Sequence, residues 1–194
     1  MILTLSYNPC QPRPLTNEES PKGQGEDNME KYIQLADKNG ARQALVISSH
    51  DMVFDRRAIL KCRWGCEDQS EPHRIKCGSR GIDFKEAQAT IHEYEKILLI
   101  HGHDHVKLSR IARKIERAAF LDGHYFACAM HSCHLCRTCQ IDLGKPCPWP
   151  HKIRPCDQSF GIDVYKTVQG LGLPCSPLQL ETDIPNRYAF VLIH

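Results

Sequence analysis

Residues 125–139 read Tyr-Phe-Ala-Cys-Ala-Met-His-Ser-Cys-His-Leu-Cys-Arg-Thr-Cys, an apolar segment that runs directly into three evenly spaced cysteines. The apolar part, residues 125–130, is typical of a buried strand because it is short and rich in aromatic and aliphatic side chains. A further cysteine, followed by proline, comes after the third with seven residues between them. This first set of cysteines comprises Cys133, Cys136, Cys139 and Cys147. The pattern predicts a strand that leads into a metal-binding loop.

The two-residue gaps within the first set indicate an iron-sulfur cluster. Such gaps allow a loop to wind around a cubic cluster so that successive thiolates reach different irons, which a straight helix or strand would not allow. In the bacterial ferredoxin pattern the fourth cysteine follows after three residues and precedes proline, whereas here the interval is seven residues. We therefore predict that these four cysteines bind a 4Fe-4S cluster.

A second, looser set of cysteines lies upstream and consists of Cys62, Cys66 and Cys77. We predict that it forms a second metal site, and two ligation schemes stay open. Cys147 either closes the first cluster or supplies the missing upstream ligand. Three thiolates would leave one iron open to water or a substrate. An eighth ligand, either Cys156 or Cys175, would give two closed clusters and favour electron transfer, and Cys156 is the better candidate because it follows Pro155.

Zinc is the alternative metal for these cysteines. Structural zinc sites usually pair two Cys-x2-4-Cys knuckles across about a dozen or more residues. The first set has three closely spaced cysteines, which is one more than such a knuckle uses. The spacing therefore favours an iron-sulfur cluster over zinc. Cys128 lies inside the apolar strand and is read as a small buried hydrophobic residue.

Composition sets the outer limits. The chain has 194 residues, 41% of them hydrophobic, which is enough for the core of one domain. Residues 9–28 have the composition of a disordered tail, so we predict a disordered N-terminal extension at residues 1–28. Residues 29–194 are predicted to form a single cysteine-rich domain. Without a secretory signal or a membrane-length apolar stretch, we expect a cytoplasmic protein with reduced thiols.

Helix and strand patterns alternate along the chain. We expect an α/β or α+β sandwich, in which a central sheet packs against helices and two cysteine-rich metal-binding loops connect these elements. Strands are predicted at residues 43–48, 96–100, 125–130 and 188–193. Helices are predicted at residues 30–38, 84–95, 106–121 and 162–171.

Two polar patterns have modest functional readings. The histidine-rich run 101–105 follows a predicted strand, and its His and Asp side chains could bind a transition metal. A solvated loop is the favoured reading, because this segment offers no fixed ligand geometry. The predicted helix 106–121 carries four basic residues opposite its apolar stripe: Arg110, Arg113, Lys114 and Arg117. They could dock an acidic redox partner or nucleic acid, but a solvated face is the usual role of such a pattern.

The order of several motifs resembles a family of predicted metal-binding proteins, the domain of unknown function 2284. The motifs are Lys61-Cys62-x2-Gly65-Cys66, Cys77, Cys133-x2-Cys136-x2-Cys139, Gly144-Lys145-Pro146-Cys147-x2-Pro150, Arg154-Pro155 and Gly161-Ile162-Asp163-Val164. The resemblance runs from Met29 to the C-terminus. It implies a cytoplasmic iron-sulfur protein of bacteria or archaea, and it implies no particular reaction.

Our leading hypothesis is a cytoplasmic iron-sulfur protein with one or two 4Fe-4S clusters and an electron-transfer or accessory redox role. The alternatives are an iron-sulfur enzyme that uses an open iron at the three-cysteine site, and a zinc-stabilised interaction module. Whether the protein is an enzyme stays open at this point, as does its oligomeric state. A redox protein partner fits these hypotheses. We expect no membrane partner, because no apolar stretch is long enough to span one. Nucleic acid is disfavoured because no aromatic residues are interleaved with the basic ones to stack on bases.

Overall fold

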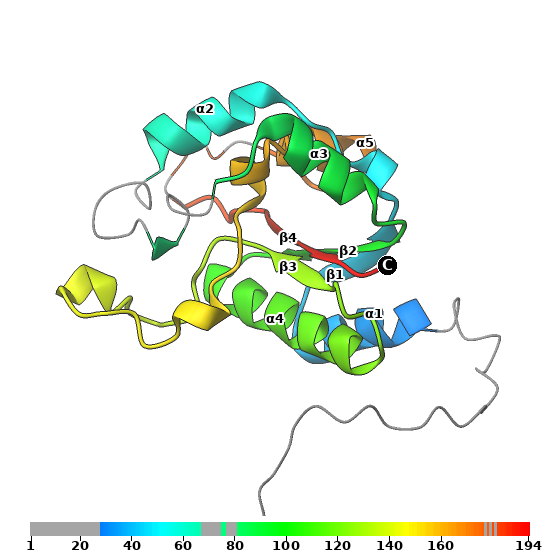
Figure 1. Ribbon diagram of the computed structural model, residues 1–194, viewed down its shortest axis with the longest axis horizontal. Coiled ribbons are helices and arrows are strands. Elements are labelled where there is room, and N and C mark those ends of the chain that lie inside the picture. Colours follow the sequence, from blue (N-terminus) through cyan, green and yellow to red (C-terminus); the bar gives the residue numbers. More distant parts are fainter. Residues whose placement is uncertain (1–27, 67–74, 77–80, 177, 179, 181) are drawn as a thin grey trace, which may run out of the picture.

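The computed structural model describes residues 28–66, 75–76, 81–176, 178, 180 and 182–194. Within this part of the chain, four antiparallel strands form one sheet in the order β1-β2-β4-β3 (Figure 1). The strands are β1 (Gln43–Ile47), β2 (Ile97–Gly102), β3 (Cys128–Met130) and β4 (Arg187–Leu192). The helices are α1 (Asn28–Lys38), α2 (Arg56–Gly65), α3 (Phe84–His92), α4 (His105–Leu121) and α5 (Val164–Gly170).

Helices cover both faces of this sheet, with α1 and α4 on one side and α2, α3 and α5 on the other (Figure 1). Alternate side chains of the central strand β2 therefore enter two separate cores. Leu98 and Ile100 pack with α1 and α4, whereas Ile97 and Leu99 pack with residues of α3 and α5. All six residues of β2 are buried. The predicted sandwich of a central sheet and packed helices is confirmed, and its antiparallel sheet makes it an α+β fold.

The turn from β2 into α4 fixes the start of the longest helix. Asp104 caps α4, and its carboxylate accepts the Lys107 backbone N–H at 2.7 Å. Gly102 lies close to this helix, because a Cβ atom there would be 3.1 Å from the Leu108 side chain. His105 is consequently the first residue of α4 and lies near the end of β2.

Two local predictions differ from the structure. Strand β3 covers only three residues, because Tyr125 and Phe126 are 73% and 84% exposed and lie outside the sheet. Helix α2 occupies a region that we expected to be an irregular loop. Its N-cap is Asp55, whose carboxylate accepts the Arg57 N–H at 2.9 Å, and the helix buries Cys62.

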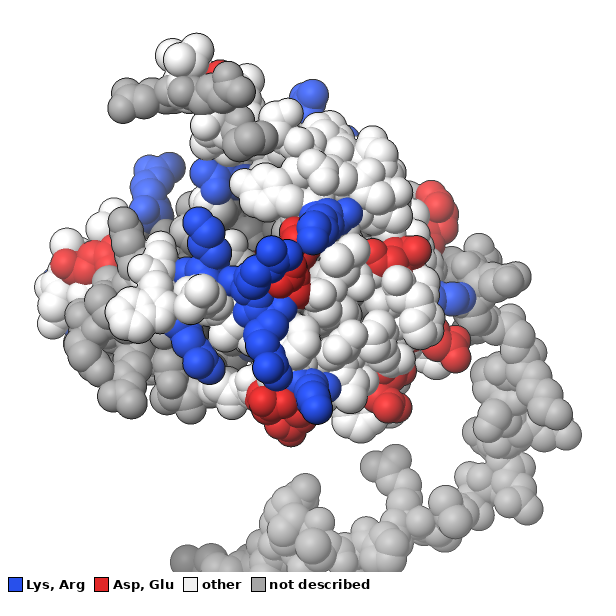
Figure 2. Space-filling model, turned by 90° about the horizontal axis from the view of Figure 1, so that it is seen from above, with Lys and Arg blue, Asp and Glu red and all other residues white. Residues whose placement is uncertain are grey.

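The surface above α2 is basic. Figure 2 shows Lys and Arg side chains gathered over the face of the molecule that carries this helix. Its exposed basic residues are Arg56, Arg57, Lys61 and Arg63. No helix in the described part of the chain is long and apolar enough to cross a membrane. The extension predicted at residues 1–28 lies outside the described residues except for Asn28, and Cys77 lies outside them too.

Candidate metal centres

One buried carboxylate ties the cysteine-rich segment to the fold. Glu116 of α4 is 8% exposed and accepts the backbone N–H of Ala129 at 2.9 Å. Arg154 donates two further bonds to the same carboxylate, one of them at 2.6 Å, and Arg113 donates a fourth at 2.9 Å. Bidentate arginine–carboxylate pairing fixes position as well as charge. Both ends of segment 129–154 are therefore anchored on α4.

The four cysteines of the first set line one cavity of about 260 Å³, the thiol pocket. Burial raises the pKa of Cys133, and the neighbouring thiols Cys147 and Cys136 raise it further. A hydrogen bond from the Leu135 N–H and the charge of Lys76 act in the opposite direction. Cys147 thus lies beside the other three cysteines of the first set.

The basic residues of α4 are engaged within the molecule. Arg110 donates to the Leu135 carbonyl at 3.2 Å, and Lys114 donates to the Asn39 side chain at 2.8 Å. Together with the bond from Arg113 to Glu116, these contacts hold the cysteine loop and α1 against the helix. The basic face of α4 therefore has a structural role at three of its four residues.

Cys62 and Cys66, the two upstream cysteines among the described residues, do not line the thiol pocket. Cys62 is 4% exposed within α2, and Cys66 forms the C-cap of that helix. Cys66, Cys156 and Cys175 line a second cavity of about 480 Å³. The thiol of Cys156 donates to the Asp157 carboxylate at 2.9 Å. Of the predicted upstream ligands, the structure brings Cys66 to the same cavity as Cys156, the residue considered as an eighth ligand.

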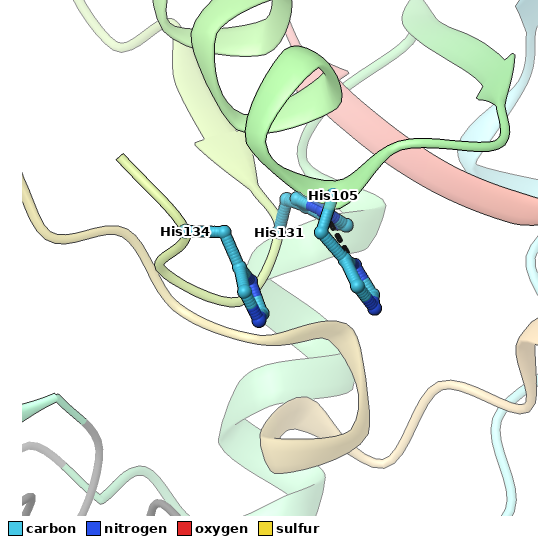
Figure 3. A group of neighbouring side chains, drawn as sticks. All are labelled: His105, His131 and His134. Atoms are coloured by element: carbon cyan, nitrogen blue, oxygen red, sulfur yellow. Dashed lines mark hydrogen bonds between the residues drawn. The ribbon is translucent and has the colours of Figure 1, made fainter. Parts of the chain in front are cut away.

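Three histidines also line this second cavity, which we call the histidine cavity. His105 comes from the start of α4, and His131 and His134 come from the loop after β3 (Figure 3). One ring nitrogen from each of them lies within 4.8 Å of the others. Nδ1 of His105 is 3.4 Å from Nε2 of His131, and the rings of His105 and His134 stack with centroids 4.3 Å apart. His134 lines the thiol pocket as well.

Comparison with known families identifies the chain. The model of a family described as predicted metal-binding protein (DUF2284) matches residues 45–193. The chain belongs to this family. No curated protein and no solved structure matches it. The matched region of this DUF2284 protein includes both cavities, and the metal-binding class agrees with their thiol and imidazole donors.

Burial favours the neutral form of two members of the histidine group, His105 and His131, in this DUF2284 protein. Burial lowers the pKa of His105 to about 3, and the charges of His134 and Arg187 act in the same direction. The pKa of His131 is also lowered, mainly by burial, although Asp157 opposes this shift. Neutral imidazoles have a free lone pair, which is the form that binds metals.

Sequence reasoning found only part of this histidine group. The run 101–105 was considered as a metal site, but only His105 belongs to the group. His101 faces Asn186 at 2.9 Å, and His103 lies 2.9 Å from the Pro185 carbonyl. His131 was not singled out. The available signal was its place two residues before Cys133, directly after the strand that delivers the cysteine loop.

Proposed function

We propose that this protein binds a 4Fe-4S cluster in the thiol pocket and transfers electrons through it. The observation that carries the proposal is that all four cysteines of the first set line one cavity. Its walls also include apolar residues, among them Val106, Ile141 and Ile153. A partly apolar surrounding limits the access of water to a cluster and tunes its reduction potential.

The spread of the thiols supports a cluster over a single zinc ion. Tetrahedral zinc with Zn–S bonds of about 2.3 Å holds its sulfurs about 3.8 Å apart. In the described part of the chain, no three cysteine sulfurs lie within 4.8 Å of one another. A cluster binds each thiolate through a different iron and therefore suits thiols that surround a cavity.

The surroundings of the pocket suit electron transfer. Its four cysteines are partly exposed, so a cluster there would lie near the surface, where a partner can approach. The Leu135 N–H and the Lys76 charge stabilise negative charge on the Cys133 sulfur, and both kinds of contact raise cluster potentials. The basic surface over α2 would steer an acidic redox protein by long-range attraction (Figure 2). Reduced thiols of this kind fit a cytoplasmic location.

Metal analysis of the anaerobically purified protein tests the proposal. We expect iron, acid-labile sulfide and visible absorption. Cys136→Ser should reduce all three to below a quarter if the protein holds one cluster, and to about half if it holds two. Cys128→Ala is the matched control, because Cys128 lies in β3 and outside the thiol pocket. Full iron and colour in Cys136→Ser would contradict the assignment, and zinc without sulfide would favour the zinc-stabilised module.

Iron stoichiometry also addresses the upstream cysteines. About four irons per chain would mean one cluster, and about eight would mean that the upstream set binds a second one. The shared cavity of Cys66 and Cys156 favours Cys156 as a ligand in that second case. An iron of this second cluster without a protein ligand would instead favour the alternative of an iron-sulfur enzyme. Changes in the electron paramagnetic resonance spectrum on addition of a substrate would support that alternative.

A further inference from the structure

The three histidines form a donor group of their own beside the thiol pocket. We propose that His105, His131 and His134 bind one divalent transition-metal ion, for which zinc is the best fit, and leave a coordination position open to the histidine cavity. The donor set is three neutral nitrogens, the kind of set that binds catalytic zinc together with one exchangeable ligand. This inference uses no cysteine ligand, so it does not depend on the proposed cluster.

The spacing of two of the nitrogens matches ligands on one ion. Two nitrogens bound to zinc at about 2.0–2.1 Å and at the tetrahedral angle lie about 3.3–3.4 Å apart. Nδ1 of His105 and Nε2 of His131 are 3.4 Å apart. This separation is at the long end for a hydrogen bond. An ion can therefore bridge this pair with little movement of either ring.

The remaining ring nitrogens of two histidines are already engaged. Nδ1 of His134 lies 3.1 Å from the Ser132 carbonyl, to which it donates, so its Nε2 is left as the donor to a metal. His131 has a backbone hydrogen bond with Tyr188 that raises its pKa, as a bond from its N–H to a carbonyl does. Metal-bound histidines commonly donate their second N–H to a carbonyl or carboxylate, which fixes the tautomer and the ring direction.

Helix α4 positions the whole group. Ser109, which is 4% exposed, donates to the Ser132 carbonyl at 3.0 Å and accepts the His134 backbone N–H at 3.2 Å. The same helix begins with His105. One rigid element thus holds a ligand at its first residue and, one turn later, the loop that carries the other two ligands. Such support holds the backbones of the three ligands in place. The stacked rings of His105 and His134 are within 9° of parallel, so one of them must turn before both in-plane lone pairs can meet one ion.

The surroundings of the open position favour an anionic ligand. Three neutral histidines do not compensate the charge of a divalent ion, and the only carboxylate among the described residues that line the cavity is Asp157. Arg187 lines the cavity together with Asn186 and Gln158, and its guanidinium donates to Nε2 of His105. A metal on Nδ1 of His105 requires the proton on Nε2, so Arg187 must turn away from the ring on metal binding. The guanidinium can then bind a small carboxylate that occupies the open position.

Cobalt titration of the anaerobically purified protein, cluster included, tests the metal site. We expect one tightly bound Co²⁺ per chain with visible d–d bands and without the near-ultraviolet thiolate-to-cobalt charge-transfer band. His134→Gln and His105→Gln should each weaken binding at least tenfold and keep the iron content of the wild type. His103→Gln is the matched control from the same loop, and it should bind as the wild type does.

Several results would overturn the proposal. The first is cobalt binding that is unchanged in His134→Gln and His105→Gln, provided that both variants keep the wild-type circular dichroism spectrum. The second is a loss of cobalt binding in His103→Gln as large as in those variants. The third is a thiolate-to-cobalt charge-transfer band that disappears in Cys156→Ser. Iron content separates this site from the cluster: Cys136→Ser should lose iron and still bind one cobalt. Acetate should shift the cobalt bands in the wild type, and Arg187→Gln should weaken that shift. An acetate-insensitive spectrum would contradict the anionic ligand.

Discussion

The thiol pocket and the histidine cavity are adjacent and yet are built in different ways. All four thiols come from one continuous stretch, residues 133–147, whereas the histidine cavity takes its walls from α2, α5, β4 and the loops around them. Donors that are close in sequence can be gathered by the metal itself, because ligation supplies free energy to order a loop. Donors from distant elements need a fold that brings them together beforehand. His134 borders both cavities and joins the two kinds of site.

Glu116→Gln should weaken both metal sites together. Of the changes discussed, it should also cause the largest loss of stability. The change leaves Arg154 and Arg113 without a charged partner and removes one acceptor at a buried position. We expect a loss of about 2–4 kcal/mol in the free energy of unfolding, measured by urea denaturation. Both iron retention and cobalt binding should weaken, because segment 129–154 carries ligands of both sites.

The exposed Glu86 provides the control for this change. Glu86→Gln lies in the first turn of α3, and it should alter the unfolding free energy by less than about 0.5 kcal/mol. A Glu116→Gln variant as stable as this control would show that the carboxylate does not anchor the loop.

Two glycines, one beside each cavity, test how well the two regions tolerate a change of the backbone. Gly161 ends the turn Asp157–Phe160 beside the histidine cavity and Gly144 ends the turn Ile141–Leu143 at the thiol pocket, with φ angles of 76° and 69°. A Cβ atom on Gly161 would lie 2.5 Å from the Phe84 ring, whereas nothing lies within 4 Å of one on Gly144. Alanine should therefore cost about 2–4 kcal/mol at Gly161 and about 1 kcal/mol at Gly144.

Thermal or urea unfolding of the two alanine variants checks this difference. Equal losses would mean that the Phe84 ring moves aside without cost. A larger loss at Gly144 would mean that the cysteine loop, and not the tertiary packing around the histidine cavity, is the less tolerant of the two regions.

His101 gives the smallest expected effect and separates a structural histidine from the proposed ligands. It is 5% exposed, and burial lowers its pKa although the bond to Asn186 opposes the shift. The unfolded chain binds a proton at about pH 6.5, whereas the folded protein resists protonation until lower pH. The free energy of unfolding should thus fall as the pH drops below about 6.5.

His101→Gln removes this titration, so its stability should depend less on pH than that of the wild type. Urea midpoints at pH 7.5 and pH 5 in both proteins measure the difference. Identical pH dependence would show that His101 is protonated alike in the folded and unfolded states. Cobalt binding at pH 7.5 should stay unchanged, since His101 is outside the histidine group.

The sequence by itself determined the elements whose signal is local. The apolar runs of β2 and β4 and the stripe of Leu108, Ile111 and Ile115 on α4 are visible as short-range patterns, and the structure buries them. The spacing of the first cysteine set is equally local. Helix α2 was missed because its apolar side chains do not follow one buried stripe: Leu60 and Trp64 are 61% and 86% exposed. Its cap at Asp55 and its packing define it more than its periodicity does.

Only the tertiary structure decided which distant donors meet. His105 and His131 are 26 positions apart, and the antiparallel β2-β4-β3 arrangement under α4 brings their rings together. The same packing places Cys66 and Cys156 in one cavity. Such contacts depend on how helices and strands bury their apolar faces against one another. The spacing of residues along the chain does not predict which distant elements pack together.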